Sequence, residues 1–290
     1  GTDIRFDTEK VASTWNFINK LWNASRFVLM NIEDFKEEDY TLEDLSISDK
    51  WILTKLNETI KNVRKNMDRY DFNNVGAILY SFIWDDFCDW YIELAKINMN
   101  NTTKSVLLKV LKDILLMLHP MMPFVTEEIY GMLPIKEYDS IMISEYPKYD
   151  KKEIFKDVTE LQEKIIKDIV AIRNLKANNN ITKDCYVVIN VNDEYKNIYL
   201  SQLKIKEEQL ISSNYKSSLV DITYYYKGSE EDNSKLLDEI KSLEESINRR
   251  KKLLSNENYV NKAPKNIVDL DRKKLEEEEE KLAILQEKVK

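Results

Sequence analysis

The chain has 290 residues, of which 43% are hydrophobic and 33% are charged, and its formal net charge is -8 at pH 7. This length predicts two or three structural units, and the hydrophobic content excludes wholesale disorder. The acidic balance excludes a protein that coats nucleic acid by bulk electrostatic attraction, but it leaves room for a local basic patch. The low glycine and proline contents, 4 and 5 residues, disfavour turn-rich all-β folds and favour a mainly α fold with long helices.

The two cysteines, Cys88 and Cys185, lie far apart, and neither has a CxxC partner. This usage fits a reducing compartment, so we expect a cytoplasmic location, and it argues against a cysteine-based zinc site. No run of about 18 apolar residues occurs, so we expect neither a transmembrane helix nor a membrane partner. The first residue is Gly1 rather than Met and no signal peptide is visible, so we interpret the chain as a piece of a longer polypeptide.

The opening stretch predicts a helix with one wide apolar face. Apolar residues recur at three- and four-residue steps, at Val11, Trp15, Ile18, Leu21, Trp22, Val28 and Leu29. We expect four tryptophans of the chain to be largely buried: Trp15, Trp22, Trp84 and Trp90. Truncation of Trp22 to Ala is then expected to cost about 3–5 kcal/mol of stability.

A second, polar stripe follows another side of the same helix. It carries amides and cations but no acid, at Asn16, Asn19, Lys20, Asn23 and Arg26. Donors of this kind suit an RNA base edge or phosphate, and Phe27 could supply a stacking surface. The same side chains could instead bond to neighbouring helices, which on pattern alone is the commoner outcome.

Further helices are predicted up to about residue 133, which together make a bundle of about five helices. Ser48 can cap the second helix, and Pro123 fits the first turn of the last one. Residues 72–97 are apolar on almost all sides, which indicates a helix at the centre of the bundle, where Gly76 would permit a close helix crossing. An extended segment at 141–146 and Pro147 close this part of the chain.

Candidate catalytic and metal-binding residues are few. The acids Asp85, Asp86, Asp89 and Glu93 have spacings that could hold a metal ion. Oxygen-only metal sites are normally built on loops, so ion pairing with a neighbouring helix is the better interpretation. The single histidine, His119, has no Ser or Cys nucleophile near it in a recognisable motif, which favours a structural role at a helix end. We therefore expect no catalytic residue and no metal site.

The middle of the chain changes character. Residues 151–176 have one apolar side at helical spacing, and Asn178–Asn180 is a plausible end for this helix. Strands are predicted at 185–191 and 220–226, with a helix at 195–210 between them. This is a small α+β unit.

The last 60 residues predict an antiparallel coiled-coil hairpin. Heptad-like series run through Leu236, Ile240, Leu243, Ile247, Arg250 and Leu254, and through Val268, Leu275, Leu282, Leu285 and Val289, where Asp271 and Glu278 interrupt. Pro264 can start the second helix, and the pair would be roughly 35 Å long. The positive charge is concentrated at the tip, on Arg249, Arg250, Lys251, Lys252, Lys262 and Lys265.

Several stretches carry a family resemblance. They are GTDIRFD with NFINKLWNASRFVLMN at the start, CDWYIELAK, HPMMPFVTEEIY, AIRNLKA, and LLSNENYVNKAPKNIV near the end. Together they resemble the bacterial valyl-tRNA synthetases, downstream of the catalytic domain. The His-Pro stretch is shared by the isoleucyl and leucyl enzymes, whereas the first and last stretches are narrower.

The resemblance implies three parts: a helical-bundle anticodon-binding domain at 1–148, a small α+β subdomain at 149–228 and an antiparallel coiled-coil arm at 229–290. It implies tRNA(Val) as partner, rather than DNA. The anticodon loop would meet Asn19, Lys20, Asn23, Arg26 and Phe27, and the tRNA elbow would meet the basic tip residues. The family usually has another strand pair before the coiled coil, whereas here Gly228 leads almost directly into an acidic run, so a shortened sheet is expected.

The chain lacks the catalytic signatures of that family. Neither HIGH nor KMSKS occurs, and no glycine-rich phosphate loop is present. The resemblance implies that the intact enzyme joins valine to its tRNA with ATP and Mg²⁺, through catalytic and editing domains outside this chain, and that this part alone is inactive. The alternative is a helical protein-interaction module whose coiled coil docks a partner helix and that has no RNA role. A steep salt dependence of RNA binding would separate the two.

Overall fold

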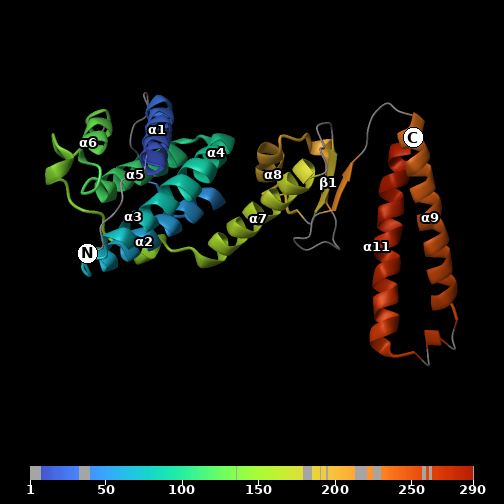
Figure 1. Cartoon of the computed structure of the whole chain (residues 1–290). Coiled ribbons are helices and arrows are strands. Elements are labelled where there is room, and N and C mark those ends of the chain that lie inside the picture. The colour runs from blue at the N-terminus through green and yellow to red at the C-terminus, as the bar shows by residue number, and fades with distance from the viewer. Residues whose placement is uncertain are drawn as a thin grey trace. The chain divides into compact units, whose positions relative to one another are not determined.

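The fold is mainly α, as the sequence predicts (Figure 1). The computed structural model describes residues 8–32, 40–134, 136–178, 185–189, 191–193, 195–212, 221–224, 230–256, 259–260 and 263–289. The chain forms two compact units, one of residues 1–169 with 195–204 and one of residues 170–194 with 205–290. The three-part division made from the sequence stays a prediction.

The first unit is a helical bundle. Its elements are α1 (Thr8–Asn31), α2 (Ile47–Met67), α3 (Phe72–Ser81), the π-helix η1 (Phe82–Tyr91), α4 (Ile92–Ala95), the 3₁₀ turn η2 (Lys96–Asn98), α5 (Asn101–Leu118) and α6 (Pro123–Gly131). Two 3₁₀ turns follow at Ile141–Ile143 and Lys151–Glu153, and then α7 (Lys156–Asn178), which belongs to this unit up to Ile169, and α8 (Lys196–Leu203). The helix with the most extensive burial is α5 rather than the stretch 72–97, because α5 buries residues on almost every side from Thr103 to Leu118.

Short polar side chains set the helix starts. Ser46, not Ser48, caps α2: its hydroxyl accepts a hydrogen bond from the Asp49 N–H at 3.1 Å, and the Asp49 carboxylate accepts from the Ser46 N–H, also at 3.1 Å. Ser48 is instead buried against Gln162 of α7. The choice between the two serines was wrong because both precede the same apolar series, and only the acid three residues after Ser46 completes a capping box. Pro123 takes the first turn of α6, as predicted.

The buried face of α1 differs from the predicted one. It is made by Phe17, Leu21, Ala24, Ser25, Val28 and Ile32, whereas Trp15 is 63% exposed. Trp22, Trp84 and Trp90 are only partly buried, so the expectation of four buried tryptophans was wrong. The most buried tryptophan among the described residues is Trp51 of α2, at 1% exposure.

The difference between the predicted and the observed buried face of α1 has a physical reason. Apolar residues cover more than half of the circumference of α1, so the pattern does not fix which part faces the core. The small side chains of Ala24 and Ser25 allow close approach on the observed side, and the Ser25 hydroxyl donates to the Leu21 carbonyl at 2.9 Å, so its polar group is satisfied inside the core. The side chain of Val11 lies outside the described part.

Gly76 does not mark a close helix crossing. A Cβ atom added at this position would meet nothing within 4 Å. Gly76 instead lines an apolar pocket of about 400 Å³ together with Phe17, Leu79 and Tyr80. The prediction of a close crossing was therefore wrong, because the glycine faces open space.

The second unit contains a three-stranded sheet of order β2-β1-β3. Strand β1 (Cys185–Ile189) pairs in parallel with β2 (Leu210–Ser212) and antiparallel with β3 (Asp221–Tyr224), with Val187 opposite both Leu210 and Ile222. The sequence predicts β1 and β3 but misses β2, because the preceding helix was expected to continue to residue 210. It ends at Leu203, since Lys204 takes a left-handed conformation (φ 54°) that stops a helix.

The hairpin is formed by α9 (Glu230–Leu254) and α11 (Lys265–Val289), which lie side by side and antiparallel (Figure 1). Each helix of 25 residues is about 37 Å long. Ile240 and Ile247 of α9 and Val268 and Leu285 of α11 are buried between the helices. The predicted heptad series therefore marks the contact face.

Candidate RNA-binding surfaces

The polar stripe of α1 divides into free and engaged side chains. Asn19, Asn23 and Arg26 are exposed, and within the described part of the chain they have no hydrogen-bond or ion-pair partner. A helix face with a free guanidinium and free amides presents donors and acceptors at fixed spacing to a polar ligand. These three side chains remain available, as the RNA interpretation requires.

Lys20 is engaged within the bundle. Its ammonium group lies 2.5 Å from an Asp89 carboxylate oxygen and 3.6 Å from the centroid of the Trp84 ring. Both partners belong to η1, whose i→i+5 hydrogen bonding continues to the Ile92 N–H, which donates to the Phe87 carbonyl. Trp84 and Asp89 are five residues apart, and residues at this spacing share a face only in such a widened helix. The π-helix therefore brings both side chains into contact with Lys20. This local change of period is invisible to a search for α-helical spacing.

The Trp84 ring that contacts Lys20 is also part of an aromatic stack. The Tyr80 ring lies between Phe17 and Trp84, with centroid separations of 5.2 and 5.5 Å and interplanar angles of 24° and 10°. Stacked rings with a cation over the last of them fix α1 against α3 and η1. Lys20 therefore has a structural role in this bundle, whatever it contributes to a ligand.

Phe27 is also engaged. It is partly buried, and the Lys96 ammonium lies 5.2 Å from its ring centroid while it pairs with Glu93 at 2.5 Å. A base could stack on Phe27 only by sharing the ring with Lys96 or by displacing it. Of the five α1 residues predicted to meet RNA, the structure thus leaves Asn19, Asn23 and Arg26 unengaged.

Two of the four predicted acids, Asp86 and Asp89, pair with cations of neighbouring helices as predicted, whereas Asp85 and Glu93 bind residues close to them in sequence. Asp89 binds Lys20, Asp85 accepts a hydrogen bond from Ser81 at 2.9 Å, and Asp86 lies 3.5 Å from Lys55. The acids do not converge: among the described residues no group of three or more His, Cys, Asp or Glu side chains could hold a metal ion. Burial raises the pKa of Asp86 from 3.8 to about 6, and the Lys55 pair offsets only part of this cost.

The raised pKa of Asp86 predicts that the stability of the bundle depends on pH. Because its folded pKa exceeds its unfolded pKa, the stability linked to the neutral acid is present below about pH 4 and is lost as the pH rises through 6. Replacing Asp86 with Asn should therefore stabilise the bundle by about 1–3 kcal/mol at pH 8 and by little at pH 4. Urea unfolding at several pH values measures this difference. Asp85→Asn is the matched control, and an equal gain at every pH for Asp86→Asn would contradict the assignment.

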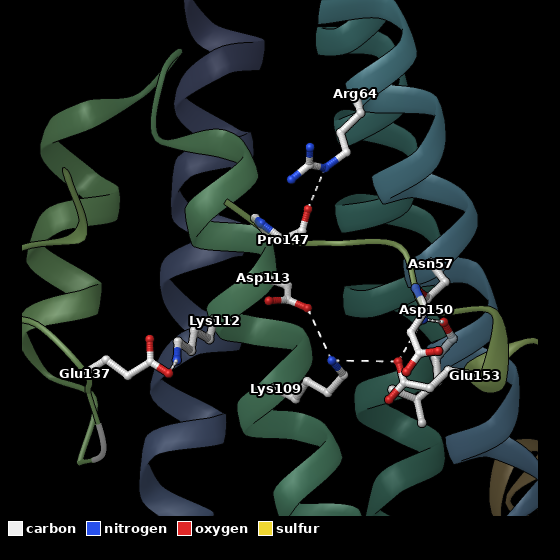
Figure 2. Close-up of polar contacts among 10 residues, drawn as sticks. Asn57, Arg64, Lys109, Lys112, Asp113, Glu137, Pro147, Asp150 and Glu153 are labelled. Atoms are coloured by element: carbon white, nitrogen blue, oxygen red, sulfur yellow. Dashed lines mark hydrogen bonds and ion pairs between the residues drawn. The ribbon is translucent and has the colours of Figure 1, made fainter. Parts of the chain in front are cut away.

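A strap of residues 144–153 crosses the bundle (Figure 2). Arg64 of α2 donates from Nε to the Pro147 carbonyl at 2.7 Å, and the buried Asn57 accepts from the Asp150 N–H at 2.7 Å and donates to Glu153 at 2.8 Å. The predicted extended segment at 141–146 instead begins with a 3₁₀ turn at Ile141–Ile143. The strap borders an open groove of about 1380 Å³.

Most lysines of this groove face acids, and Lys148 pairs with Glu145 at 2.5 Å. Lys109 lies between Asp113 and Glu153, at 3.6 and 3.7 Å, and Lys112 lies 3.8 Å from Glu137, as Figure 2 shows. Burial raises the pKa of Asp113. Cations that already face acids attract a phosphate weakly, so we do not place RNA in this groove.

His119 has the structural role predicted from the sequence. Its Nδ1 lies 2.7 Å from the Thr126 hydroxyl, which donates to the Met122 carbonyl at 2.9 Å. The hydrogen-bonded chain ties the end of α5 to the first turn of α6. Sequence reasoning could not name Thr126 as the partner, because the turn between the helices decides which residue meets the ring.

The basic tip of the hairpin is only partly free. Arg249, Lys252 and Lys265 are exposed, and Lys251 is paired with Glu279 at 2.6 Å. Lys262 lies outside the described residues. Arg250 differs from all of these, because it turns into the helix interface.

Arg250 binds two acids of the opposite helix. It donates from Nη1 to Asp271 at 2.9 Å, and from Nη2 and Nε to Glu278 at 2.9 and 3.2 Å. Tyr259 and Ser246 complete this layer, with hydrogen bonds to Asp271 at 2.6 Å and to Glu278 at 3.1 Å. Arg250, the charged member of the first heptad series, therefore meets the two acids that interrupt the second series. Arg250 is 19% exposed and unsuited to contact RNA.

The structure adds exposed residues that the sequence analysis did not select. Trp15 lies on the same face of α1 as Asn19 and Arg26, and Arg272, Lys273 and Lys274 are exposed on α11, seven to nine residues after it begins. The signal for the second group was the run of three basic residues itself. The signal for Trp15 was ambiguous, because an aromatic residue at helical spacing more often faces the core.

Comparison with known proteins covers both units. Residues 49–190 match the family described as the anticodon-binding domain of tRNA ligase, and residues 230–290 match the family described as the valyl tRNA synthetase tRNA binding arm. Valine–tRNA ligases are similar over nearly the whole chain: that of Staphylococcus saprophyticus is 39% identical over 97% of it, and that of Listeria innocua is 38% identical over all of it. The chain belongs to the valyl-tRNA synthetase family.

The chain spans 35% and 36% of the length of these two synthetases. The alignments run over 320 and 318 positions, more than the 290 residues of this chain, so these valyl-tRNA synthetases carry residues that it lacks. The two matched regions are named for tRNA recognition and not for catalysis. In the described residues no helix is long and apolar enough to cross a membrane.

Proposed function

We propose that this chain is the tRNA-recognition part of a valine–tRNA ligase. In this proposal the exposed face of α1 binds the anticodon loop of tRNA(Val), and the hairpin tip binds the elbow of the same tRNA. The observation that carries the proposal is the set of exposed donors on α1, Asn19, Asn23 and Arg26, which have no partner among the described residues, whereas Lys20 of the same stripe is paired with Asp89. The names of the two matched families support the same assignment.

The proposal for the whole enzyme rests on the names of the similar proteins, which are valine–tRNA ligases. The intact synthetase would join valine to tRNA(Val) in the cytoplasm, using ATP and Mg²⁺. These ligands would bind to catalytic parts outside this chain, because neither HIGH nor KMSKS occurs in its 290 residues. The remaining partner is the rest of the synthetase polypeptide, and neither DNA nor a membrane is part of the proposal.

The α1 face is tested by replacing Arg26 with Ala. The guanidinium is exposed and unpaired in the described structure, so its loss should leave the free energy of unfolding unchanged within about 0.5 kcal/mol. Binding of a valine tRNA transcript should weaken by about 1–3 kcal/mol, because a base contact is lost. Titration of the full chain with labelled tRNA measures the change.

Lys167→Ala is the matched control for Arg26→Ala, because it removes an exposed cation from α7. It should bind tRNA like the unmodified chain. If Arg26→Ala and Lys167→Ala bind equally well, α1 does not read the anticodon loop. Binding of unrelated tRNAs as tightly as valine tRNA would also contradict the proposal.

The hairpin tip is tested by changing Arg249, Lys252 and Lys265 together to Gln. Each phosphate contact contributes about 0.7–0.9 to the slope of log affinity against log salt, so the triple variant should lower the slope by about two units. Binding of all tRNAs should weaken about equally, because phosphate contacts carry no sequence information. The hairpin should remain folded, since the three side chains are exposed.

The control for the tip variant is Lys241→Gln, which removes an exposed cation from the stem of α9. Its salt slope should equal that of the unmodified chain. An unchanged slope in the triple variant would show that the tip does not touch RNA. The hairpin would then be explained better as an arm that docks a protein helix, since helix docking releases few counterions.

A further inference from the structure

Trp15 is an exposed aromatic residue in a polar setting. Its side chain is 63% exposed on α1, and within the described part of the chain it has no ring, hydrogen-bond or ion-pair partner. Tryptophan is highly buried on average, and exposing an indole to water forgoes a large apolar contribution to stability. An exposed indole therefore calls for an explanation in a helix whose Phe17 and Phe27 rings contact neighbouring side chains.

The helix geometry places Trp15 beside the free donors. Trp15, Asn19 and Arg26 follow one another at steps of four and seven residues, so they lie along one face of α1. All three are exposed, as are Asn16 and Asn23 next to them. Trp15 and Arg26 are 11 residues apart, which is about 16 Å along the helix. They would therefore contact different nucleotides of one bound loop.

The neighbours of Trp15 decide which ligand fits. A protein partner would be expected to meet a contiguous exposed apolar patch, whereas the apolar neighbours Ile18 and Trp22 are partly buried and the exposed side chains beside Trp15 include the carboxamides of Asn16 and Asn19. A flat indole with hydrogen-bonding groups beside it suits an unstacked nucleobase, which stacks on the ring and presents its edge to the amides. The face carries no carboxylate between residues 12 and 30, so it does not repel a phosphate backbone.

We propose that Trp15 is a stacking platform for a second unpaired nucleobase of the RNA loop that Arg26 contacts. This inference rests on the proposed function of α1 and adds a residue to it. Stacking supplies affinity and depends little on which base is present, whereas Arg26 and the amides supply the base preference. Trp15 thus positions the loop on the helix.

The test uses the full chain and three variants: Trp15→Ala, Trp15→Phe and the control Phe124→Ala, which removes an aromatic ring that is 90% exposed on α6. Trp15→Ala should weaken binding of valine tRNA by about 5- to 150-fold, the range that base stacking on aromatic side chains gives. Trp15→Phe should retain most of the affinity, and Phe124→Ala all of it. The salt slope of Trp15→Ala should be unchanged, because stacking releases no counterions.

Fluorescence gives a second readout. Of the five tryptophans, Trp51 is buried and three others are partly buried, so acrylamide should quench mainly Trp15. Saturating tRNA should protect this component, and Trp15→Phe should lack it. If Trp15→Ala binds normally and tRNA gives no protection, while Arg26→Ala weakens binding, the stacking role is wrong and the function of α1 stands. If neither Trp15→Ala nor Arg26→Ala changes binding, both proposals fail together.

Discussion

Replacing Trp51 with Ala should lower the free energy of unfolding of the bundle by about 3–5 kcal/mol, because the side chain is 1% exposed and its removal leaves a large cavity. Trp51 lies on α2 among Ile52, Leu53 and Leu56, which are all fully buried. Neighbours packed this tightly relax only partly into a cavity, so the loss should lie in the upper part of that range. Urea unfolding followed by circular dichroism measures it.

Trp51→Phe is the matched variant. The Trp51 Nε1–H has no hydrogen-bond partner among the described residues, and leaving such a donor buried costs about 1–3 kcal/mol. Phenylalanine removes this cost while it keeps most of the apolar volume, so Trp51→Phe should cost much less than Trp51→Ala. Trp15→Ala should cost under about 0.5 kcal/mol. A loss from Trp15→Ala as large as that from Trp51→Ala would mean that the register of α1 differs from the one described.

The exposure of Trp15 shows how much of the structure of α1 its apolar pattern predicts. Helical spacing correctly predicts that residues 8–31 form a helix, because the spacing is a local property. The side that faces the core depends on the shapes of the neighbours, and with apolar residues on more than half of the circumference several registers bury similar areas. Ala24 and Ser25 decide between them, since a small side chain matters only when another helix lies against it.

The candidate site was predictable in its location but not in its membership. The acid-free stripe on α1 correctly marks an exposed face with free amides and a guanidinium. Lys20 could not be separated from Asn19 and Asn23 by spacing alone, because its partners Asp89 and Trp84 meet it only through the widened turn of η1. A π-helix has no strong signature in residue type, so the loss of one member of the stripe was beyond sequence reasoning.

At the hairpin tip, too, the sequence predicts where the basic residues lie but not which of them are free to bind. The six basic residues were grouped because they are close in sequence. The heptad positions separate Arg250 from the others, since it occupies a core position while Asp271 and Glu278 occupy core positions on the opposite helix. The sequence holds this information only once the two helices are set in register, which the interruptions themselves help to fix.

Replacing Arg250 with Ala should lower the local stability of the hairpin by about 2–3 kcal/mol, because Asp271 and Glu278 would face the interface without a cation. The loss should fall short of that for a fully buried pair, since the three side chains remain about one-fifth exposed. Hydrogen exchange of the α9 and α11 amides in the full chain reports this local opening. The Arg250 hydrogen bond also lowers the pKa of Glu278. The stability that it contributes is present above about pH 4.5 and is lost as the pH falls.

A compensated variant separates this ionic layer from simple packing. Changing Arg250, Asp271 and Glu278 together to Leu should restore hairpin stability or raise it, because an apolar layer carries no desolvation cost. The restored hairpin should also lose the acid sensitivity that Glu278 confers. Its exchange protection should become less uniform along the helices, because leucine layers fit more than one register whereas the Arg250 layer fits only one. If Arg250→Ala leaves amide exchange unchanged, or if the triple Leu variant keeps one uniform protection pattern, the layer does not set the register of the arm.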